Sequence, residues 1–500
     1  MPEVRVGPLL RHVGATDATV WVETDQPCRV EVLGHHADTF EVEGHHFALV
    51  CVAGLDPSRE HPYAVHLDGQ KAWPPDDYDF PPPRIRLMRQ DGSLRLVFGS
   101  CRASAPHHPP YTHRHWWHLK GQGIDVLRAY GLRMRDQPSA LWPDALMMLG
   151  DQLYADQVND TIKDLVAERE VHADGPVEVL EDFEEYCIGY WDAWRDPVVR
   201  WMLSTLPSSM MFDDHEINDK WNTSQAWLAE KRRTDWYQTR IIGGLMAYWI
   251  YQHLGNMSPD ELAEDTTFQR VQATRQGADA IHRRGMGLDH REGRRALRAP
   301  AVRQLGADPA AVRDARRRGL DRGGGRRGVG TTVHLAGGEA AHRGQPRPLG
   351  VLPGQLPRLR GPGGRRRGGQ AGAGAAPPTT TKLWQVVCSG LRKDTSAVEA
   401  MVLRLGHTRV ASAVGRMLRR TVAVDPPRLR WRAVTKPQFR NQIGTLELAG
   451  GRMAVRIERA TGGWRRPRLT PVIEQRLLLV SAGQAGVRWI GRRVGPRSEL

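Results

Sequence analysis

The sequence predicts an α/β fold in which an N-terminal β-sandwich precedes a layered α/β domain. Two observations carry this prediction. Before about residue 90, apolar and polar residues alternate in short runs, which is typical of half-buried strands. Beyond that point, apolar strand-like runs alternate with helical periods, which is typical of a sheet covered by helices. With 500 residues, the chain has ample length for a large core.

The sandwich prediction depends on three alternating runs, at residues 18–23, 28–33 and 46–52. Turn residues separate them, so we expect a small antiparallel β-sandwich over residues 1–90. The prolines at 74–75 and 81–83 predict a stiff linker to the next domain.

The second domain opens with a buried strand at residues 95–101. Helical periods follow at 124–135, 161–169, 181–195 and 227–252, and strand character resumes at 382–389 and within 427–458. We therefore divide the rest of the chain into 91–270 and 381–478, the two parts of the α/β domain, with the segment 271–380 between them and a tail at 479–500.

The basicity of the chain belongs to its central segment. The whole chain has a net charge of +15, but residues 269–381 alone hold 23 Arg, no Lys and 7 acidic residues, a net of +16, which leaves −1 elsewhere. No aromatic residue occurs between Phe268 and Trp384. This distribution argues against a nucleic-acid-binding surface that extends over the whole protein.

Two interpretations of the segment 271–380 stay open, and both expect it to be irregular or disordered. One is a disordered Arg/Gly linker that binds nucleic acid. The other, which we favour, is a frameshift, because GC-rich coding sequence translated out of frame produces this Arg/Gly/Ala/Pro mixture. The degenerate codons of residues 352–364, read from the second base, permit the run Ser-x-Asp-Ser-Tyr-His.

Other sequence features limit the class of protein. The five cysteines show no CxxC spacing, so neither a disulfide framework nor a zinc knuckle is expected. No apolar run is long enough to predict a transmembrane helix. The N-terminus has no signal-peptide or twin-arginine pattern, so we expect a cytoplasmic protein.

Two strand-to-loop segments carry the chemistry. The first, residues 146–156, is an apolar strand followed by Gly150 and Asp151; the second, residues 211–217, contains Asp214 and His215. Strands of an α/β sheet deliver such residues to its carboxyl edge. Carboxylate oxygens and an imidazole at one edge are typical of a two-metal site that cleaves phosphoesters.

These segments resemble the PhoD-like alkaline phosphatases of the metallophosphatase superfamily. The resemblance covers roughly residues 1–270 and 380–478. It depends on the FGSC strand at 98–101, the GDQLYAD loop at 150–156, the FDDHE motif at 212–216, the strand at 382–389 and the run PPYT at 109–112. It implies an N-terminal β-sandwich and the hydrolysis of phosphomonoesters or phosphodiesters.

The resemblance also implies a role for each matched residue. Asp151 bridges two metals, and Cys101 and Tyr154 bind Fe³⁺. Asp156 and Asp214 bind Ca²⁺. His215 faces the phosphate ester and is catalytic with Asp151. The family's closing Gly-Asp-x-His motif is absent as translated, so we expect weak or no activity from this chain.

Each residue also has a structural alternative. In these alternatives, Asp151 would cap a loop, and Cys101 would be a small buried side chain. Tyr154 would pack its ring, and His215 would be a hydrogen-bond partner. Asp213 and Glu216 are expected to support the site rather than bind metal. The histidines at 107, 108, 113, 115 and 118 share no helix face and predict a loop beside the site. A scaffold that binds no metal remains the further alternative.

Overall fold

In the computed structural model, the structure describes residues 1–115, 117–167, 169, 179–219, 225–273, 333–335, 351–355, 382–421, 435, 438–449 and 452–478. Most of the segment 271–380 and the tail 479–500 lie outside these residues. Both interpretations of that segment therefore concern residues that the structure does not describe. Its described residues include the strands β14 (Val333–Leu335) and β15 (Val351–Gln355), which pair with β16 (Lys382–Val386).

The N-terminal region is rich in sheet, as the alternating runs predict. One sheet has the order β1-β2-β6-β5 and the other β4-β3-β8-β9. A common apolar core that includes Val20, Val50, Val30 and Val65 joins them. The strands are β1 (Val4–Val13), β2 (Ala18–Thr24), β3 (Arg29–Val32), β4 (His35–Asp38), β5 (Phe40–Val42), β6 (His45–Val52), β8 (Val65–Leu67) and β9 (Gln70–Trp73). The short pair β7 (His61–Pro62) and β10 (Arg84–Ile85) lies beside them.

The central sheet positions the site. Its strands β11 (Leu94–Arg102), β12 (Ala145–Met148) and β13 (Ser208–Met210) are parallel neighbours. The register pairs Gly99 with Met148 and Met148 with Met210, so β12 and β13 end level with each other, while β11 continues to Arg102. The segments that follow these strands therefore meet at one edge of the sheet, as expected for parallel strands.

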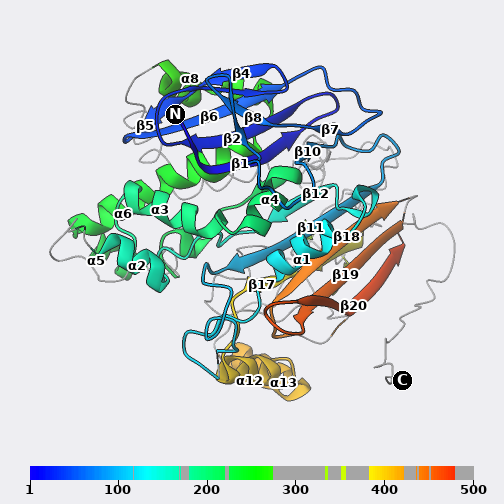
Figure 1. Cartoon of the computed structure of the whole chain (residues 1–500). Helices are drawn as coiled ribbons and strands as arrows, with labels where there is room; N and C mark the ends of the chain where they lie inside the picture. Colours follow the sequence, from blue (N-terminus) through cyan, green and yellow to red (C-terminus); the bar gives the residue numbers. More distant parts are fainter. Residues whose placement is uncertain are drawn as a thin grey trace, which may run out of the picture.

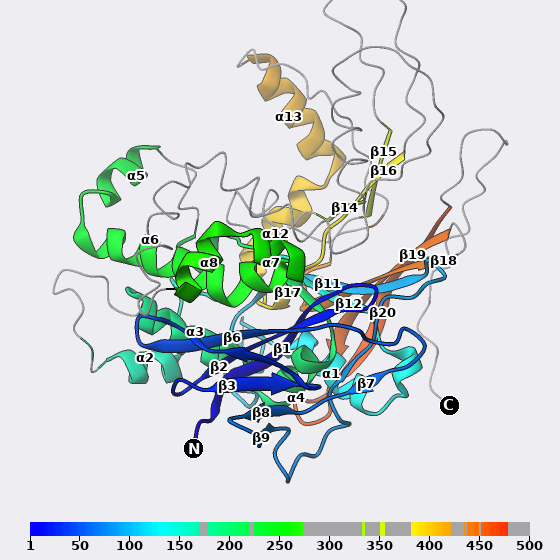
Figure 2. The same ribbon diagram turned by 90° about the horizontal axis from the view of Figure 1, so that it is seen from above.

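The C-terminal strands complete this sheet from the other side. β18 (Gln442–Ala449) runs antiparallel to β11, and β19 (Arg452–Thr461) and β20 (Arg468–Leu478) follow in order. Beyond β18, the end of β11 pairs in parallel with β17 (Ser389–Arg392). Figures 1 and 2 both show β18, β19 and β20 on the side of the molecule away from α5 (Gln225–Lys231) and α6 (Asp235–Tyr248).

Helices pack against both the N-terminal sheets and the central sheet. The predicted helical stretches at 124–135, 161–169 and 181–195 correspond to α1 (Val126–Arg135), α2 (Asp160–Val166) and α3 (Phe183–Trp194). The stretch at 227–252 is interrupted, because α5 and α6 are separate and a π-helical turn η3 (Trp249–His253) follows α6. The other helical segments among the described residues are η1 (Ser139–Leu141), α4 (Pro197–Thr205), η2 (Asp214–Glu216), η4 (Leu254–Asn256), α7 (Pro259–Glu264), α8 (Thr266–Ala273), α12 (Ala397–Gly406) and α13 (Arg409–Thr421).

An aromatic cluster joins the sandwich to the helices. Trp21 of β2 lies 5.2 Å from Tyr251 between ring centroids, and Tyr251 stacks on Tyr190 of α3 at 4.4 Å. These rings are almost fully buried and provide large apolar contact areas. None of the described helices has both the length and the apolar character needed to cross a bilayer. All five cysteines are free.

Candidate metal centre

The turns that follow β11 and β12 require unusual backbone conformations. Gly150 has φ 108°, and the next residue, Asp151, has φ 53°; Cys101 at the end of β11 has φ 59°. A Cβ atom on Gly150 would lie 2.5 Å from the Cβ of Asp213, so only glycine fits. Left-handed conformations at non-glycine residues are strained and cluster at functional sites, and here they turn Asp151 and Cys101 toward each other.

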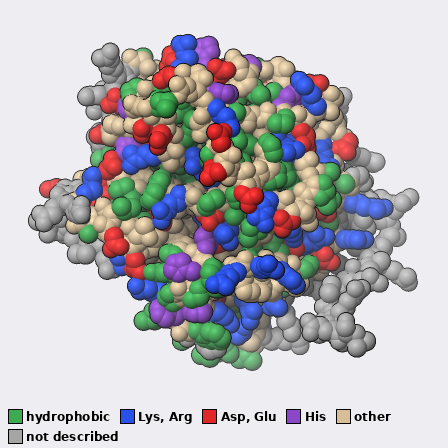
Figure 3. All heavy atoms as spheres, viewed as in Figure 1, with side chains coloured by type: hydrophobic (Ala, Val, Ile, Leu, Met, Phe, Trp, Pro, Cys, Tyr) green, Lys and Arg blue, Asp and Glu red, His purple; other side chains and the backbone are tan. Residues whose placement is uncertain are grey.

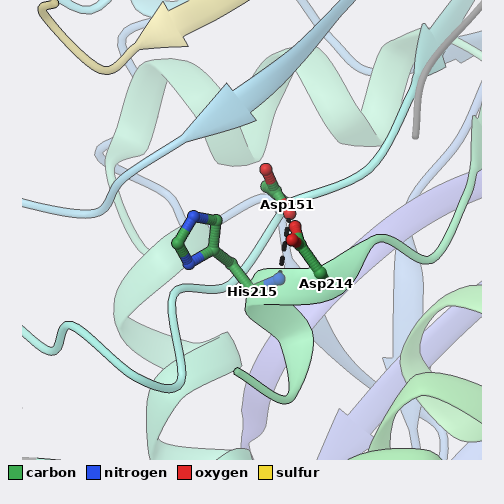
Figure 4. A group of neighbouring side chains, drawn as sticks. All are labelled: Asp151, Asp214 and His215. Carbon is green, nitrogen blue, oxygen red and sulfur yellow. Dashed lines mark hydrogen bonds between the residues drawn. The ribbon is translucent and has the colours of Figure 1, made fainter. Parts of the chain in front are cut away.

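Asp151, Asp214 and His215 converge at this edge (Figure 4). One ligand atom from each lies within 4.8 Å of the other two. The backbone N–H of His215 also donates to Oδ1 of Asp151 at 3.3 Å. Two carboxylates and an imidazole form a donor set that divalent and trivalent cations accept, so this group is the candidate metal site.

Cys101 lies directly beside Asp151. Its thiol donates to Oδ2 of Asp151 at 3.1 Å, and the hydroxyl of Ser389 on β17 donates to Sγ at 3.0 Å. The predicted proximity of Cys101 to the site is therefore present. The contact from Ser389 comes from the far side of the central segment, 288 positions along the chain.

Tyr154 is buried against the same group. Its ring centroid lies 4.4 Å from that of His215, and Nζ of Lys393 lies 4.4 Å from the Tyr154 ring centroid. Burial, followed by the nearby Cys101 and Asp151, raises the pKa of the Tyr154 hydroxyl well above 10. The phenol therefore stays protonated unless a cation binds it.

Asp156 contacts His215 in this structure. Its Oδ1 and Oδ2 lie 2.8 and 2.9 Å from Nδ1 of His215, and its Oδ2 accepts from the backbone N–H of Asp219 at 2.7 Å. Burial raises the pKa of Asp156, but the hydrogen bond and charge of His215, with the Asp219 N–H and Arg240, together outweigh burial and lower the pKa. Asp156 was predicted from the resemblance as a metal ligand; here it holds the imidazole.

Glu216 connects the two strand ends through their backbones. Its Oε2 accepts from the N–H of Asp151 at 3.1 Å and of Asp213 at 2.9 Å, and its Oε1 accepts from the N–H of Gln152 at 2.8 Å. Asp213 and Glu216 also form a capping box around η2. Both therefore shape the loop that presents Asp214 and His215; that they support the site rather than bind metal stays a prediction.

The buried carboxyl groups of the site repel one another. Burial, followed by the charge of Cys101 and of neighbouring carboxylates, raises the pKa of Asp151 well above its usual value. Burial and the charges of Asp214 and Glu216 raise the pKa of Asp213 to about 8, and burial raises the pKa of Glu216 to about 7. A cation would remove this repulsion, so the donor set fits a bound metal.

The histidine-rich loop does not gather its rings at the metal ligands. Nε2 of His107 lies 3.4 Å from a carboxylate oxygen of Asp196, and the ring of His108 packs on Tyr111. Within the described residues, the one group of three or more ligating side chains is Asp151, Asp214 and His215. The expectation that these histidines form a loop outside the ligand set agrees with this arrangement.

Several supporting residues are not among the predicted site residues. Ser389 contacts Cys101, Asp219 contacts Asp156, and Nε2 of Gln252 donates to Glu216 at 3.1 Å. Ser389 lies within the matched strand and its motif could have identified it. Gln252 and Asp219 had no such signal, because their positions depend on the loop after β13 and on the π-helical turn.

Two family models match separate parts of the chain. Residues 1–85 match a family model described as a domain of unknown function, DUF7800. No curated protein matches the chain. A solved structure titled "Structure of PhoD" is similar at 10% identity and a TM-score of 0.47, covering 99% of this chain and 94% of that one. Residues 118–282 match the model of the PhoD-like phosphatases. The chain therefore carries a PhoD-like phosphatase segment, and this segment contains Asp151, Asp214 and His215.

Proposed function

We propose that this chain is a metal-dependent phosphoester hydrolase that acts on phosphomonoesters or phosphodiesters. The observation that carries the proposal is the approach of Asp151, Asp214 and His215 to within 4.8 Å at the ends of β12 and β13. The family match over residues 118–282 supports a phosphoesterase and does not favour the nucleic-acid alternative, which depends on residues outside the described ones.

The neighbours of Asp151 support a division of the ligands into two sets. Cys101 contacts Asp151, and Tyr154 interacts with both; a thiolate and a phenolate suit Fe³⁺. Asp214, with Asp156 behind His215, offers the oxygen ligands that Ca²⁺ prefers. In this assignment Asp151 is the carboxylate shared by both cations.

The chain's own residues position the phosphate ester. When bound, two cations supply Lewis-acid activation of water and neutralise the charge of the phosphoryl group. Asp156 holds Nδ1 of His215, which leaves Nε2 to face a phosphoryl oxygen or to protonate the leaving group. Nζ of Lys393, over the Tyr154 ring, adds positive charge where an anionic substrate would lie.

We further propose that the activity of the chain as translated is weak. The site gathers a single imidazole from the described residues, and the sequence lacks the family's closing Gly-Asp-x-His motif. Repair of the reading frame across codons 270–380 should supply the missing ligand and restore the activity.

Metal content tests the proposal without depending on turnover. Elemental analysis of the purified chain should find iron and calcium, and Asp151→Asn and Asp214→Asn should each lower the bound metal about tenfold or more. Asp164→Asn, an exposed carboxylate on α2, is the matched control. Hydrolysis of p-nitrophenyl phosphate and bis(p-nitrophenyl) phosphate should rise when the frame is repaired. A chain that binds no metal, and a repaired chain that hydrolyses neither ester, would refute the proposal.

A further inference from the structure

The two helices after β17 turn their apolar faces outward. Val398, Val402 and Leu405 repeat along one face of α12, and Val410, Val414 and Met417 along one face of α13, as helical spacing requires. The exposed fraction of these side chains ranges from 45% at Val414 to 73% at Val410. With Met401 and Leu418, these helices hold eight of the fifteen large apolar side chains that are exposed among the described residues.

A second exposed apolar segment lies next to these helices. Trp117 and Leu119 are 66% and 83% exposed. Their loop is fixed to the residues before α12, because the N–H of His115 donates to Asp394 at 3.0 Å and Arg114 pairs with the same carboxylate at 3.5 Å. Hydrophobic side chains gather at this end of the molecule, with basic side chains around them (Figure 3).

The charge around this apolar surface is positive. Residues 397–421 contain five Arg and one Glu. Arg404 and Arg416 are exposed, and Lys120 lies in the adjoining loop. Contiguous exposed apolar surface marks an interaction site. Basic amphipathic helices with an aromatic neighbour are suited to lie in the headgroup region of an anionic bilayer.

We propose that α12, α13 and the loop around Trp117 dock on an anionic lipid surface. The apolar faces of the helices enter the headgroup region, and the arginines contact lipid phosphates. The contact lies in the plane of the bilayer, since none of the described helices could cross one. This interaction does not depend on the proposed hydrolase activity.

Vesicle flotation of the full chain tests this proposal. The chain should float with phosphatidylcholine vesicles that contain phosphatidylglycerol, and much less with pure phosphatidylcholine. The double variant Val402→Asp with Val414→Asp should reduce the bound fraction about tenfold or more. The double variant Leu141→Asp with Leu165→Asp changes leucines of similar exposure, 51% and 46%, and should bind as the parent does.

Three results would overturn the lipid proposal. The parent chain fails to float with anionic vesicles; the helix variant floats as well as the parent; or light scattering shows that the parent is a dimer that the helix variant dissociates, which would make this face an interface between two copies. Circular dichroism of both double variants establishes that they are folded.

A separate set of buried contacts connects the N-terminal sheets to the metal centre. Arg11 of β1 is fully buried. One of its guanidinium nitrogens donates to the backbone carbonyl of Gln252 at 2.6 Å and to Oδ1 of Asn256 at 3.1 Å. The Asn256 side chain in turn makes two hydrogen bonds to the backbone of Met210: it accepts from the Met210 N–H at 2.9 Å and donates to the Met210 carbonyl at 2.7 Å. Met210 ends β13, directly before the loop that holds Asp214.

The same π-helical turn reaches Glu216. Nε2 of Gln252 donates to Oε1 of Glu216 at 3.1 Å and to the hydroxyl of Tyr190 at 2.8 Å. Glu216 holds the backbone of Asp151 through the contacts described above. Arg11 therefore fixes the backbone of Gln252, and the Gln252 side chain fixes the carboxylate that supports the metal ligands. A π-helical turn often occurs at such a functional position.

We infer that the N-terminal sheet region is a positioning element for the metal centre, with Arg11 and Gln252 as positioning residues that act through Glu216. The inference rests on the proposed function for its effect on metal affinity. Its effect on the backbone of Asp151 is independent of any metal.

Hydrogen exchange separates the effect on the backbone of Asp151 from the effect on metal affinity. In Arg11→Met, the amides of Asp151, Gln152 and Asp213 should exchange about tenfold faster or more, and metal affinity should fall about tenfold or more. Gln252→Leu should have the same effects. Arg5→Met is the matched control, since Arg5 also joins β1 to α3, through Glu184, but has no such connection to Glu216 among the described contacts.

The outcomes separate this inference from the proposed function. Unchanged exchange at Asp151 and Gln152 in Arg11→Met would overturn the positioning role, whatever the metal content. Equal acceleration in Arg5→Met would also overturn it, since any loss of contact between the two regions would then suffice. Faster exchange in a chain that binds no metal would sustain the positioning role while the hydrolase proposal fails.

Discussion

Asp156 holds both carboxylate oxygens within 2.9 Å of Nδ1 of His215. Burial lowers the pKa of His215, but the hydrogen bond and charge of Asp156 outweigh it and the pKa is raised. The contact also fixes the ring orientation, so the imidazole presents Nε2 away from Asp156. The pair therefore defines which nitrogen is available for a substrate or a metal.

Replacement of Asp156 tests this orientation. Asp156→Asn keeps the size of the side chain but removes its charge, so we expect phosphoester hydrolysis by the frame-repaired chain to fall by about 10- to 100-fold. Steady-state kinetics on p-nitrophenyl phosphate measures the change, with Asp164→Asn as the control. Unchanged turnover in Asp156→Asn would show that the orientation of His215 is unimportant for the reaction.

Gly150→Ala should destabilise the fold strongly. The new methyl group would meet the Cβ of Asp213 at 2.5 Å, in a backbone with φ 108°. We expect a loss of about 3 kcal/mol or more in the free energy of unfolding, from backbone strain and overpacking together. Urea denaturation measures it. Gly44→Ala, where φ is 81° and no atom lies within 4 Å of the new Cβ, should lose only about 1–2 kcal/mol.

His45 makes the stability of the chain dependent on pH. Burial lowers its pKa, but hydrogen bonds to Cys187, Glu184 and Glu23 outweigh burial and raise the pKa from 6.5 to about 12. Because the folded pKa lies above the unfolded one, this contribution is complete below 6.5 and is lost as the pH rises toward about 12.

The comparison of His45→Gln with the parent isolates this contribution. The difference in the free energy of unfolding between the two chains should be larger at about pH 6 than at about pH 10. Urea denaturation at both values measures it, and His46→Gln on the same strand is the control. A difference that does not change with pH would contradict the assignment of the charge to His45.

Without a bound metal, the ionised carboxylates of the site should lower the free energy of unfolding. Without a cation, the pKa of Asp213 is raised from 3.8 to about 8 and that of Glu216 from 4.5 to about 7. These groups favour their neutral form in the folded chain, so the free energy of unfolding should fall as the pH rises from about 4 to about 8.

Thermal melts with and without a chelator check this pH dependence. The chelator should lower the Tm more at about pH 8 than at about pH 5, since a bound cation stabilises the ionised carboxylates. In Asp213→Asn the chelator's effect should depend less on pH. A chelator effect that is the same at both pH values would argue that no cation occupies this group.

The sequence predicts those features of the site that depend on strand geometry. The parallel order of β11, β12 and β13 follows from buried apolar runs, and it alone brings Cys101, Asp151 and Asp214 to one edge of the sheet. The pairing of Asp156 with His215 could not be predicted in the same way. It depends on the path of the short loop after β13, which local periodicity does not specify.

The helical stretch at 227–252 shows a second limit. The polar run at residues 230–235 interrupts its apolar period, and the structure ends α5 at Lys231. The period does not predict the change to a π-helical turn at Trp249. Long-range contacts from Arg11 and Glu216 to Gln252 stabilise that turn. Periodicity in one segment contains no information about partners 36 and 241 residues away.

The pairing of β11 with β17 and β18 has a consequence for synthesis of the chain on the ribosome. β11 ends at Arg102, but its partners on this edge begin at Ser389 and Gln442. At elongation rates of about 5–20 residues per second, that edge stays unpaired for tens of seconds while the intervening chain is made. An open strand edge recruits other strands, so this edge exposes the nascent chain to mispairing and aggregation until its last strands emerge.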